Sequence, residues 1–380
     1  MIPPPATSVP TKGLEGIVAT ESTVCTVFGD EGRLIYRGYD IHDLADHSTF
    51  EETAYLLLNG ELPTRVQLKT FTGQIKASQK VDRVVHRVIK DAPASADPMH
   101  VLRTAVSAAV FVDPDRGDDS RAAEYRKAVR LIAQLPTMLG AFHRLRSGKK
   151  PLTPRRGLSL AANTLYLLTG EIPEADVARA FDVALILHAD HELNASTFAA
   201  RVIAATLADM HGAVTGAIAA LAGPLHGGAN TAVMKMLLDV KTPDRAEAWV
   251  RERLARKEKI MGFGHRVYRT EDPRASHLRR MSEELGRKFG QSHWFAIQRI
   301  IEDVVKRDKG LYCNVDFYSA SLYYVMGIPL DLYTPIFAVS RVSGWCAHVL
   351  EQHADNRLIR PRADYVGPLN RRWTPPRKRA

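Results

Sequence analysis

Helical patterns run through almost the whole sequence and leave little material for a β-sheet. Residues 173–189 begin with a proline and then repeat apolar side chains on one helical face, which is typical of an amphipathic helix. Residues 49–60 predict another helix with defined ends, because Thr49 and Glu52 form a capping-box pattern and Gly60 can end the last turn. The expected class is therefore mainly α.

Strand-like alternation is convincing in only one place, residues 24–38. This segment predicts a β-hairpin whose turn lies at residues 30–32. No GxGxxG sequence opens a βαβ unit and no Walker A sequence is present, which excludes the usual nucleotide-binding folds. We expect a multi-helical fold with one small N-terminal hairpin. Changes in helix density at residues 110–155, 222–228 and 326–335 mark candidate domain edges.

The composition is that of a soluble, cytoplasmic protein with a large core. With 380 residues, 45% of them hydrophobic, the chain is long enough for two domains. No apolar run approaches the roughly 18 residues of a membrane helix. Residues 1–13 lack the apolar centre of a secretory signal and are expected to be disordered. Cys25, Cys313 and Cys346 form no CxxC pair, so we expect three free core cysteines.

The net charge of +10 is concentrated at the C-terminal end. Eight Lys and Arg and one Asp follow residue 356, a surplus of 8 − 1 = +7. A basic arm of this kind can bind nucleic acid, so a non-catalytic basic scaffold is one alternative function. We favour a solvated basic tail at residues 369–380, because the body contains no recognisable nucleic-acid module. Neither a nucleic acid nor a membrane is expected as a partner.

Four glycine-punctuated or loop-like segments carry polar side chains inside otherwise apolar sequence. They are HADHELNAS from residue 188, GPLHGGAN from residue 223, MGFGHRVYRTEDPR from residue 261, and NVDFYSAS from residue 314. Their histidines, arginines and carboxylates are the candidate functional residues of the chain.

Two of the histidines differ from ordinary core histidines, because glycines flank them. A packed histidine does not need glycines, whereas glycine lets backbone and ligand approach closely, so His226 and His265 are candidates for function. His191 follows the polar end of the helix at 173–189 and is a third candidate. His188 lies on the apolar face of that helix and is expected to be a core residue.

Asp316 has two interpretations that the sequence leaves open. It could cap the helix that follows it, since Asp is a good N-cap residue, or it could be a catalytic base between apolar neighbours. No metal site is expected, because the spacing of His188, His191 and Glu192 matches neither HExxH nor HxxEH.

Several histidines, one carboxylate and several arginines together suit proton abstraction next to a carbonyl. The carboxylate takes a weakly acidic C–H proton, and a histidine donates a hydrogen bond to the carbonyl oxygen, where negative charge develops. Arginines such as Arg266, Arg269 and Arg274 can hold and polarise a polyanionic second substrate.

Six short motifs resemble those of the citrate synthases, in the order found in that family. They are YRGYDI, DHELNAS, GPLHGGAN, GFGHRVY…DPR, NVDFYSA and SRVSGWCAH…RLIRPRADYVGP. The resemblance covers residues 14–368 and implies a nearly all-α homodimer of the compact type. Residues 14–226 and 328–368 would form a large domain, and residues 227–327 a smaller, mobile one. The small domain would close over oxaloacetate and form the acetyl-CoA site, which excludes water.

The resemblance also implies a role for each matching residue. The catalytic residues would be Asp316, which takes a methyl proton from acetyl-CoA, His226, which stabilises the enol or enolate at the thioester oxygen, and His265, which polarises the oxaloacetate ketone. The oxaloacetate ligands would be His191, Arg274, Arg341 and, from the other subunit, Arg360. The citryl-CoA intermediate would then be hydrolysed to citrate and CoA.

The implied CoA contacts lie in and near the glycine-rich segment. The backbone of Met261, Gly262, Phe263 and Gly264 would surround the adenine, and Arg269 would bind a phosphate. Lys259 and Arg362 are further phosphate candidates by charge alone. Acetyl-CoA would be a substrate, so no cofactor is expected.

The nearest alternative function is that of a 2-methylcitrate synthase, which uses propionyl-CoA in the same reaction. The two activities share every catalytic position named above. One methylene in an apolar pocket discriminates by only about 10- to 200-fold, so an enzyme with both activities is also an alternative. We favour the citrate-forming activity on the GPLHGG and GHRVY versions of the motifs.

Overall fold

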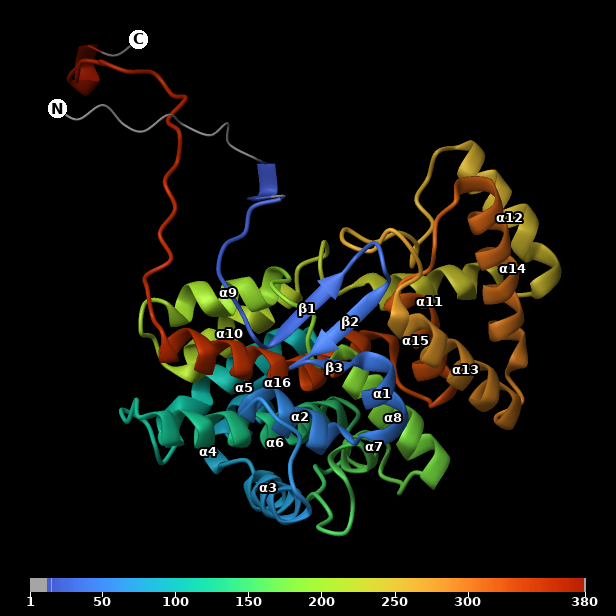
Figure 1. The fold of residues 1–380 in the computed structure, drawn as a ribbon, viewed down its shortest axis with the longest axis horizontal. Coiled ribbons are helices and arrows are strands. Elements are labelled where there is room, and N and C mark those ends of the chain that lie inside the picture. Colours follow the sequence, from blue (N-terminus) through green and yellow to red (C-terminus); the bar gives the residue numbers. More distant parts are fainter. Residues whose placement is uncertain (1–11, 15, 379–380) are drawn as a thin grey trace.

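The computed structural model describes residues 12–14 and 16–378 and confirms the mainly α class (Figure 1). The α-helices in this part of the chain are α1 (Ile41–His47), α2 (Phe50–Asn59), α3 (Arg65–Ser78), α4 (Arg83–Asp91), α5 (Pro98–Ala109), α6 (Arg121–Arg146), α7 (Leu160–Thr169), α8 (Ala175–His188), α9 (Ala195–Ala204), α10 (Met210–Leu221), α11 (Ala229–Val240), α12 (Pro243–Ala255), α13 (Pro273–Lys288), α14 (Ser292–Lys309), α15 (Val315–Val325) and α16 (Tyr333–Ala354). Short 3₁₀ turns lie at Lys12–Leu14, Val110–Val112, Leu330–Leu332 and Pro376–Lys378.

The predicted hairpin is confirmed and continues into a third strand. Strands β1 (Cys25–Phe28) and β2 (Arg33–Tyr36) pair antiparallel, with Cys25 opposite Tyr36. Strand β3 (Tyr39–Asp40) then pairs with β2, so the sheet order is β1-β2-β3. Asp40 also caps α1 by accepting a hydrogen bond from the amide of His42, which joins the sheet directly to the first helix.

The predicted ends of α2 are largely confirmed. The Thr49 hydroxyl accepts from the amide of Glu52 at 3.2 Å, and Gly60 ends the helix with φ 94°, a conformation that suits glycine. A full capping box would also have the Thr49 amide donate to the carboxylate of Glu52. That carboxylate instead accepts from the Ser48 hydroxyl at 2.9 Å.

Helix α8 begins two residues later than its sequence suggests, at Ala175 rather than Pro173. Its apolar face is buried as predicted, and His188 is a core residue with 1% of its surface exposed. The Nδ1 atom of His188 lies 2.7 Å from the carbonyl oxygen of Ala184, one helical turn earlier. The three cysteines are also free and buried, as expected.

Helix α16 runs through the centre of the body and packs against α2, α6, α8, α9 and α10. Its buried face includes Arg341, Trp345 and His348. Gly344 lets this helix approach the chain that leaves α8, because a Cβ at that position would collide with the carbonyl oxygen of Ala189 and the carboxylate of Asp190. The approach brings polar side chains of α16 to the segment that follows α8.

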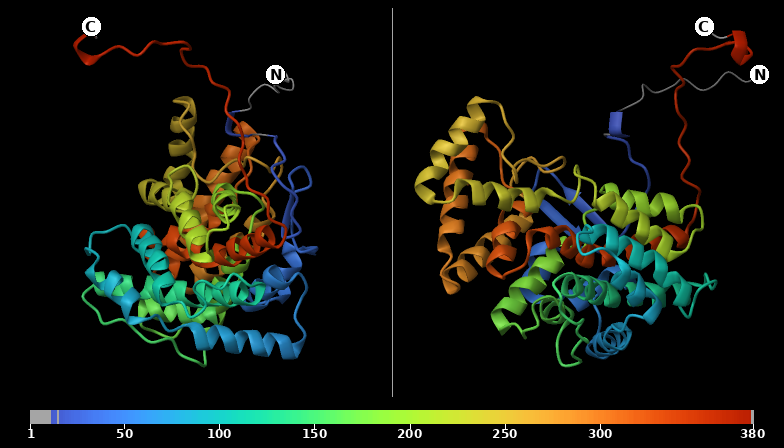
Figure 2. Two further views of the ribbon diagram at one scale, coloured as in Figure 1. Left: turned by 90° about the vertical axis from the view of Figure 1, so that its left-hand side faces the viewer. Right: turned by 180° about the vertical axis from the view of Figure 1, so that it is seen from behind.

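Helices α11 to α15 lie together at one side of the body, as Figure 1 and the rear view of Figure 2 show. Within this group α13 packs on α15, α12 packs on α14, and α11 packs on α15. The helices α1 and α8 touch α13 from the other side. The predicted division into a large domain and a mobile small domain at residues 227 and 327 stays a prediction.

The segments at the two ends of the chain leave the same side of the helical body (Figure 2). Residues 355–375 contain no helix or strand, and most of their side chains are exposed. Most of the predicted disordered start, residues 1–11, lies outside the described residues, as do residues 379–380 of the predicted basic tail. No helix in the described part of the chain is long and apolar enough to cross a membrane.

Candidate active site

A cleft of about 450 Å³ brings together six of the side chains that the sequence singled out. They are His191, His226, His265, Arg274, Asp316 and Arg341. They come from five parts of the chain: the loop after α8, the turn before α11, the glycine-rich segment with the first turn of α13 that follows it, the first turn of α15, and α16. The fold therefore gathers the four polar segments of the sequence around one hollow.

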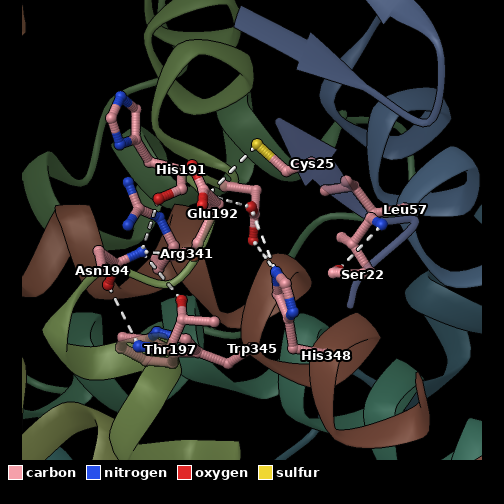
Figure 3. Close-up of polar contacts among 12 residues, drawn as sticks. Ser22, Cys25, Leu57, His191, Glu192, Asn194, Thr197, Arg341, Trp345 and His348 are labelled. Carbon is pink, nitrogen blue, oxygen red and sulfur yellow. Dashed lines mark hydrogen bonds and ion pairs between the residues drawn. The ribbon is translucent and has the colours of Figure 1, made fainter. Parts of the chain in front are cut away.

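The loop after α8 is held by a buried carboxylate, that of Asp190. This carboxylate accepts from the amide of Glu192 at 2.9 Å and lies 3.3 Å from Nε2 of His348 on α16, as Figure 3 shows for Glu192 and His348. The hydroxyl of Tyr36 donates to the carbonyl oxygen of Asp190 at 2.8 Å. The backbone at Glu192 has φ 53°, which is uncommon for a residue other than glycine. These contacts fix the loop that carries His191.

His226 is held as a neutral ring with one nitrogen free to donate. The amide of Ser196 points at its Nε2 at 3.3 Å, and the Ser196 hydroxyl lies 2.9 Å from the same nitrogen. Because a peptide N–H can only donate, Nε2 must accept and the proton sits on Nδ1. Burial, followed by the charge of Arg341, lowers the pKa of His226 to about 4, so the ring is neutral near pH 7. Trp345 donates to the Ser196 hydroxyl at 3.1 Å and so supports the arrangement.

His265 is also held as a neutral ring, but a different turn of the chain fixes it and the proton lies on the other nitrogen. Its Nδ1 accepts from the amides of Val267 and Tyr268, at 3.0 and 3.1 Å. The proton therefore sits on Nε2, and the ring is a hydrogen-bond donor. Burial and the charge of Arg274 lower the pKa of His265 to about 4. Its ring lies 5.1 Å from that of His191, centroid to centroid.

Asp316 is not the N-cap of its helix, so that interpretation is wrong. The helix α15 begins one residue earlier, at Val315, and the side chain of Asn314 caps it by accepting from the amide of Asp316 at 3.1 Å. The carboxylate of Asp316 is thereby left to line the cleft. Burial raises its pKa to about 6, against the opposing charges of Arg274 and Arg341.

The buried carboxylate of Asp272 joins two helix starts. It accepts from Nε and Nη2 of Arg274 at 2.9 and 2.7 Å, and from the amide of Arg274 at 3.1 Å, which caps α13. The same carboxylate accepts from the amide of Val315, the first residue of α15, at 3.1 Å. Asp272 is 1% exposed and Arg274 is 3% exposed. One residue thus positions both Arg274 and the helix turn that presents Asp316.

Arg341 reaches the cleft from α16. Its Nε donates to the carbonyl oxygen of His188 at 2.6 Å, and its guanidinium lies 4.7 Å from the centre of the Phe337 ring. Burial is the main cause that lowers the pKa of His191, with Arg274 and Arg341 adding to it, so His191 is neutral beside two cations.

The tip of the hairpin supports the segment that carries His265. The amide of Arg269 donates to the carbonyl oxygen of Gly29 at 3.0 Å. A Cβ at Gly29 would collide with the carbonyl oxygen of Val267, and a Cβ at Gly32 would lie 2.7 Å from Cγ2 of Thr270. Both glycines are therefore needed for this close approach of two backbones.

Of the residues predicted to bind CoA, only Gly264 lines the cleft. The segment 261–264 is joined to the start of α15, because Gly264 donates to the carbonyl oxygen of Tyr312 and Asn314 donates to that of Gly262, each at 2.9 Å. Gly262 has φ 85°, and a Cβ there would lie 2.7 Å from the Phe317 ring.

The remaining predicted side chains are exposed and lie outside the cleft. Lys259, Arg269 and Arg362 are solvent-exposed. Arg360 is exposed too and lines a separate hollow between residues 14–23 and the end of α16. The structure thus does not bring Arg360 to the cleft of its own chain.

The cleft can take a proton from carbon and hold an anion. A carboxylate with a raised pKa suits a general base near neutral pH, and two neutral imidazoles can each donate to an oxygen that gains charge. The two buried arginines of the cleft, Arg274 and Arg341, can bind the carboxylates of an anionic ligand. These features define an enzyme that makes or breaks bonds next to a carbonyl, as acyl-transferring enzymes do.

The comparisons with known proteins give the family. The family described as "Citrate synthase, C-terminal domain" matches residues 13–362. "Citrate synthase 2" of Bacillus subtilis (strain 168) is 50% identical, over 97% of this chain and 99% of its own length. A citrate synthase of Haloferax volcanii is 49% identical over 96% and 97%, and a 2-methylcitrate synthase of Mycobacterium tuberculosis is 44% identical over 94% and 90%.

Solved structures that resemble this chain are citrate synthases as well. The citrate synthase of Pyrobaculum aerophilum has a TM-score of 0.92 and 41% identity, covering 97% of this chain and 95% of its own. The citrate synthase of Thermoplasma acidophilum, solved as a ternary complex with carboxymethyl coenzyme A and oxaloacetate, has a TM-score of 0.93 and 34% identity, covering 98% and 100%. This chain belongs to the citrate synthase family and is an acyltransferase.

Sequence patterns missed the residues that position the site. In the sequence Asp272 stands out only as part of the segment that ends at Arg274, and Ser196 and Asn314 carry no signal beyond their polar type. The Asp-Pro-Arg order was the usable clue for Asp272, because Asp before Pro is a common helix start and its carboxylate can reach a guanidinium two residues later.

We predict that Asp272→Asn destabilises the fold and disorders the site. Removing one partner of a buried ion pair leaves Arg274 uncompensated and costs about 3–5 kcal/mol of unfolding free energy. Urea denaturation at pH 7 measures this loss. The matched control is Glu247→Gln, which removes an exposed pair with Arg251 and should cost about 0–1 kcal/mol. Equal, small losses in the two variants would contradict the role given to Asp272.

Proposed function

We propose that this chain is a citrate synthase that condenses acetyl-CoA with oxaloacetate and hydrolyses citryl-CoA to citrate and CoA. The observation that carries the proposal is the cleft in which a carboxylate of raised pKa shares space with two histidines, each locked as a neutral donor by peptide amides. The membership of the family and the similarity to citrate synthases over nearly the whole chain support it.

The proposed first step is removal of a methyl proton from acetyl-CoA by the carboxylate of Asp316. The Nδ1–H of His226 donates to the thioester oxygen as charge develops there, and the product is the enol or enolate of acetyl-CoA. Because His226 is neutral before the step, it stabilises the oxygen by hydrogen bonding and need not give up a full proton.

The proposed second step joins the enol carbon to the ketone carbon of oxaloacetate. The Nε2–H of His265 donates to the ketone oxygen, which becomes the hydroxyl of citryl-CoA.

His191, Arg274 and Arg341 bind the carboxylates of oxaloacetate, together with Arg360 of the partner subunit. Water then cleaves the thioester, releasing citrate and CoA. The pairing of Arg274 with Asp272 supports a fixed direction for its remaining donor atoms.

The proposed CoA contacts are the backbone of residues 261–264 and the cations Lys259, Arg269 and Arg362. Their exposure leaves them accessible to phosphates, and the segment 261–264 is attached to the helix that presents Asp316. The Thermoplasma acidophilum citrate synthase, which shares this fold, holds a CoA derivative together with oxaloacetate, which supports a common cleft for the two.

We also propose a cytoplasmic homodimer in which residues 227–327 form the mobile small domain on the large domain at 14–226 and 328–368. The exposed position of Arg360, outside the cleft of its own chain, supports a role in the partner's cleft. Acetyl-CoA enters as a substrate, and the proposed steps use no resident cofactor and no metal.

A second candidate is the use of propionyl-CoA to form 2-methylcitrate. The observation that favours it is the 44% identity to a 2-methylcitrate synthase of Mycobacterium tuberculosis over nearly the whole chain. The proposed steps are the same for both acyl groups, so the choice depends on how one methylene is accommodated in the cleft.

The proposed function predicts release of CoA from both substrates, with acetyl-CoA preferred. At saturating oxaloacetate, kcat/KM for acetyl-CoA should exceed that for propionyl-CoA by up to about 200-fold. Asp316→Asn should lower both by about 10²- to 10⁴-fold, whereas the exposed Asp303→Asn should change neither. Free thiol is followed over time. A preference for propionyl-CoA would establish the second candidate, and no thiol release from folded protein would refute the proposal.

The pKa of Asp316 predicts an acid limb in the pH–rate profile. The carboxylate must be ionised to accept a proton, so activity is present above its pKa of about 6 and falls as the pH drops through that value. His226 and His265 stay neutral across this range, because their pKa values are about 4. The measurement is kcat/KM for acetyl-CoA from pH 5 to pH 8. A flat profile would rule out Asp316 as the base at this pKa.

Mixed dimers would establish whether Arg360 acts across the interface. Arg360→Ala and Asp316→Ala should each be inactive alone. In a hybrid of the two, one cleft keeps its own Asp316 and receives Arg360 of the partner subunit, so about half of the wild-type activity per dimer should return. Differently tagged chains are co-expressed and the hybrid is isolated. An inactive hybrid would show that Arg360 acts within its own chain, if it acts at all.

A further inference from the structure

Helix α13 connects the cleft to the first helices of the body. Its first turn carries Arg274, which lines the cleft and is paired with Asp272. One side of α13 packs on α14 and α15, and the other side packs on α1 and α8 (Figure 1). A shift of α13 relative to α1 would therefore move an anion-binding arginine of the cleft.

A pair of histidines joins α13 to α1, one helical turn after Arg274. The Nδ1 atom of His42, on α1, lies 2.8 Å from Nε2 of His277, on α13, and the two ring centroids are 5.0 Å apart. One of these nitrogens must accept for the hydrogen bond to form, so the contact holds one proton between the rings. Two protonated rings would each direct an N–H at the other and could not keep the contact.

The surroundings of His277 favour its neutral form. Its Nδ1 lies 3.5 Å from the carboxylate of Asp46, on α1, and Arg280 lies 3.5 Å from the same carboxylate. Burial is the main cause that lowers the pKa of His277, and the charge of Asp46 opposes it. The ring of His42 and the cations Arg280 and Arg179 add to the lowering. A proton on Nδ1 of His277 faces Asp46 and leaves Nε2 to accept from His42.

The charged groups on the neighbouring helices are engaged in pairs of their own. On α8, Arg179 pairs with Asp182 at 3.0 Å. Burial raises the pKa of Asp182 to about 7, but its carboxylate accepts from the amide of Phe50 and so faces α2. On the side of α13 that meets α14, Arg279 pairs with Glu302. None of these pairs bridges α13 and α1.

The far end of α13 is held by exposed ion pairs. The ammonium of Lys288 lies 2.9 Å from the carboxylate of Glu174 and 2.6 Å from that of Asp176, next to and in the first turn of α8. Exposed pairs of this kind contribute little, and neither carboxylates nor ammonium groups ordinarily change charge between pH 5.5 and pH 8. Imidazoles do change charge in that range, so the histidine pair is the contact between α13 and α1 that responds to pH.

We propose that the contact between His42 and His277 is a pH-sensitive latch, which holds α13 on α1 and thereby keeps Arg274 in the arrangement that binds a carboxylate. Above the ordinary imidazole value of about pH 6.5 the latch is closed. As the pH falls through that value, the open state takes up protons that the closed state excludes, so the latch opens. The latch stands on these contacts alone, whereas the identity of the carboxylate ligand as oxaloacetate rests on the proposed function.

Two substitutions of His42 should act in opposite directions. His42 is exposed in the first turn of α1, so both variants are expected to fold. His42→Asn places an amide where Nδ1 was, and an amide can donate or accept, so the latch should stay closed from pH 5.5 to pH 8. His42→Lys places a permanent cation there and should open the latch even at pH 8. The matched control is His100→Asn, which replaces an exposed histidine of α5.

Hydrogen–deuterium exchange of the full chain without ligand measures the latch directly. The peptide that covers residues 273–285 is compared at pH 8 and pH 5.5, after correction for the intrinsic exchange rate. Wild type and His100→Asn should exchange about threefold faster or more at pH 5.5. His42→Asn should show no such increase, and His42→Lys should exchange fast at both pH values. An equal increase in wild type and His42→Asn would overturn the proposal.

Titration with oxaloacetate by calorimetry tests the effect on the cleft. From pH 8 to pH 5.5 the affinity of wild type should fall by about three- to tenfold, and that of His42→Asn should not fall. Protonation of Asp316 near pH 6 removes a negative charge from the cleft and favours anion binding, so it has the opposite sign.

His42→Lys should bind oxaloacetate weakly even at pH 8, and an affinity equal to that of wild type there would show that the latch does not control the cleft. Absence of oxaloacetate binding in every form of the chain would instead contradict the proposed function. In that case the exchange measurement still decides the latch, because it uses no ligand.

Discussion

The pairing of Asp272 with Arg274 is the interaction on which the rest of the site depends. Four hydrogen bonds converge on this one buried carboxylate, and they come from the guanidinium, from the start of α13 and from the start of α15. A charge buried without a partner is costly, so neither residue can move independently. The arginine of the cleft and the helix that presents Asp316 are therefore fixed by the same group.

The helices of this protein form the frame, and the histidines of the cleft and Asp316 lie on short segments between helices or on a first turn. Peptide amides point at one ring nitrogen of each of two cleft histidines, from Ser196 for His226 and from Val267 and Tyr268 for His265, and the Ser196 hydroxyl also lies 2.9 Å from Nε2 of His226. Such contacts need correct backbone placement within a few tenths of an ångström. The hairpin tip and the close approach of α16 at Gly344 provide that placement.

Local sequence patterns were sufficient for the class, for the hairpin and for the four polar segments that meet at the cleft, whereas Arg341 was assigned only through the resemblance to the family. Glycine flanks distinguished His226 and His265 from His188, which is indeed a core residue. The patterns failed where a neighbouring side chain took the expected contact or where the partner was distant in the sequence. The carboxylate of Glu52 accepts from Ser48 instead of the Thr49 amide, and Asn314 instead of Asp316 caps α15. Asp272 was overlooked because its partner Val315 lies 43 residues away. Arg360 cannot be assigned from one chain, because its proposed target lies on another.

The contact between the hairpin and the segment after His265 is made by main-chain atoms. The amide of Arg269 meets the carbonyl oxygen of Gly29, so the placement of residue 269 does not require an arginine there. The side chain of Arg269 is therefore not needed for this contact, and it can be replaced while the backbone keeps its place. The position of the loop that carries His265 is therefore set by the glycines of the hairpin and not by the residue type at position 269.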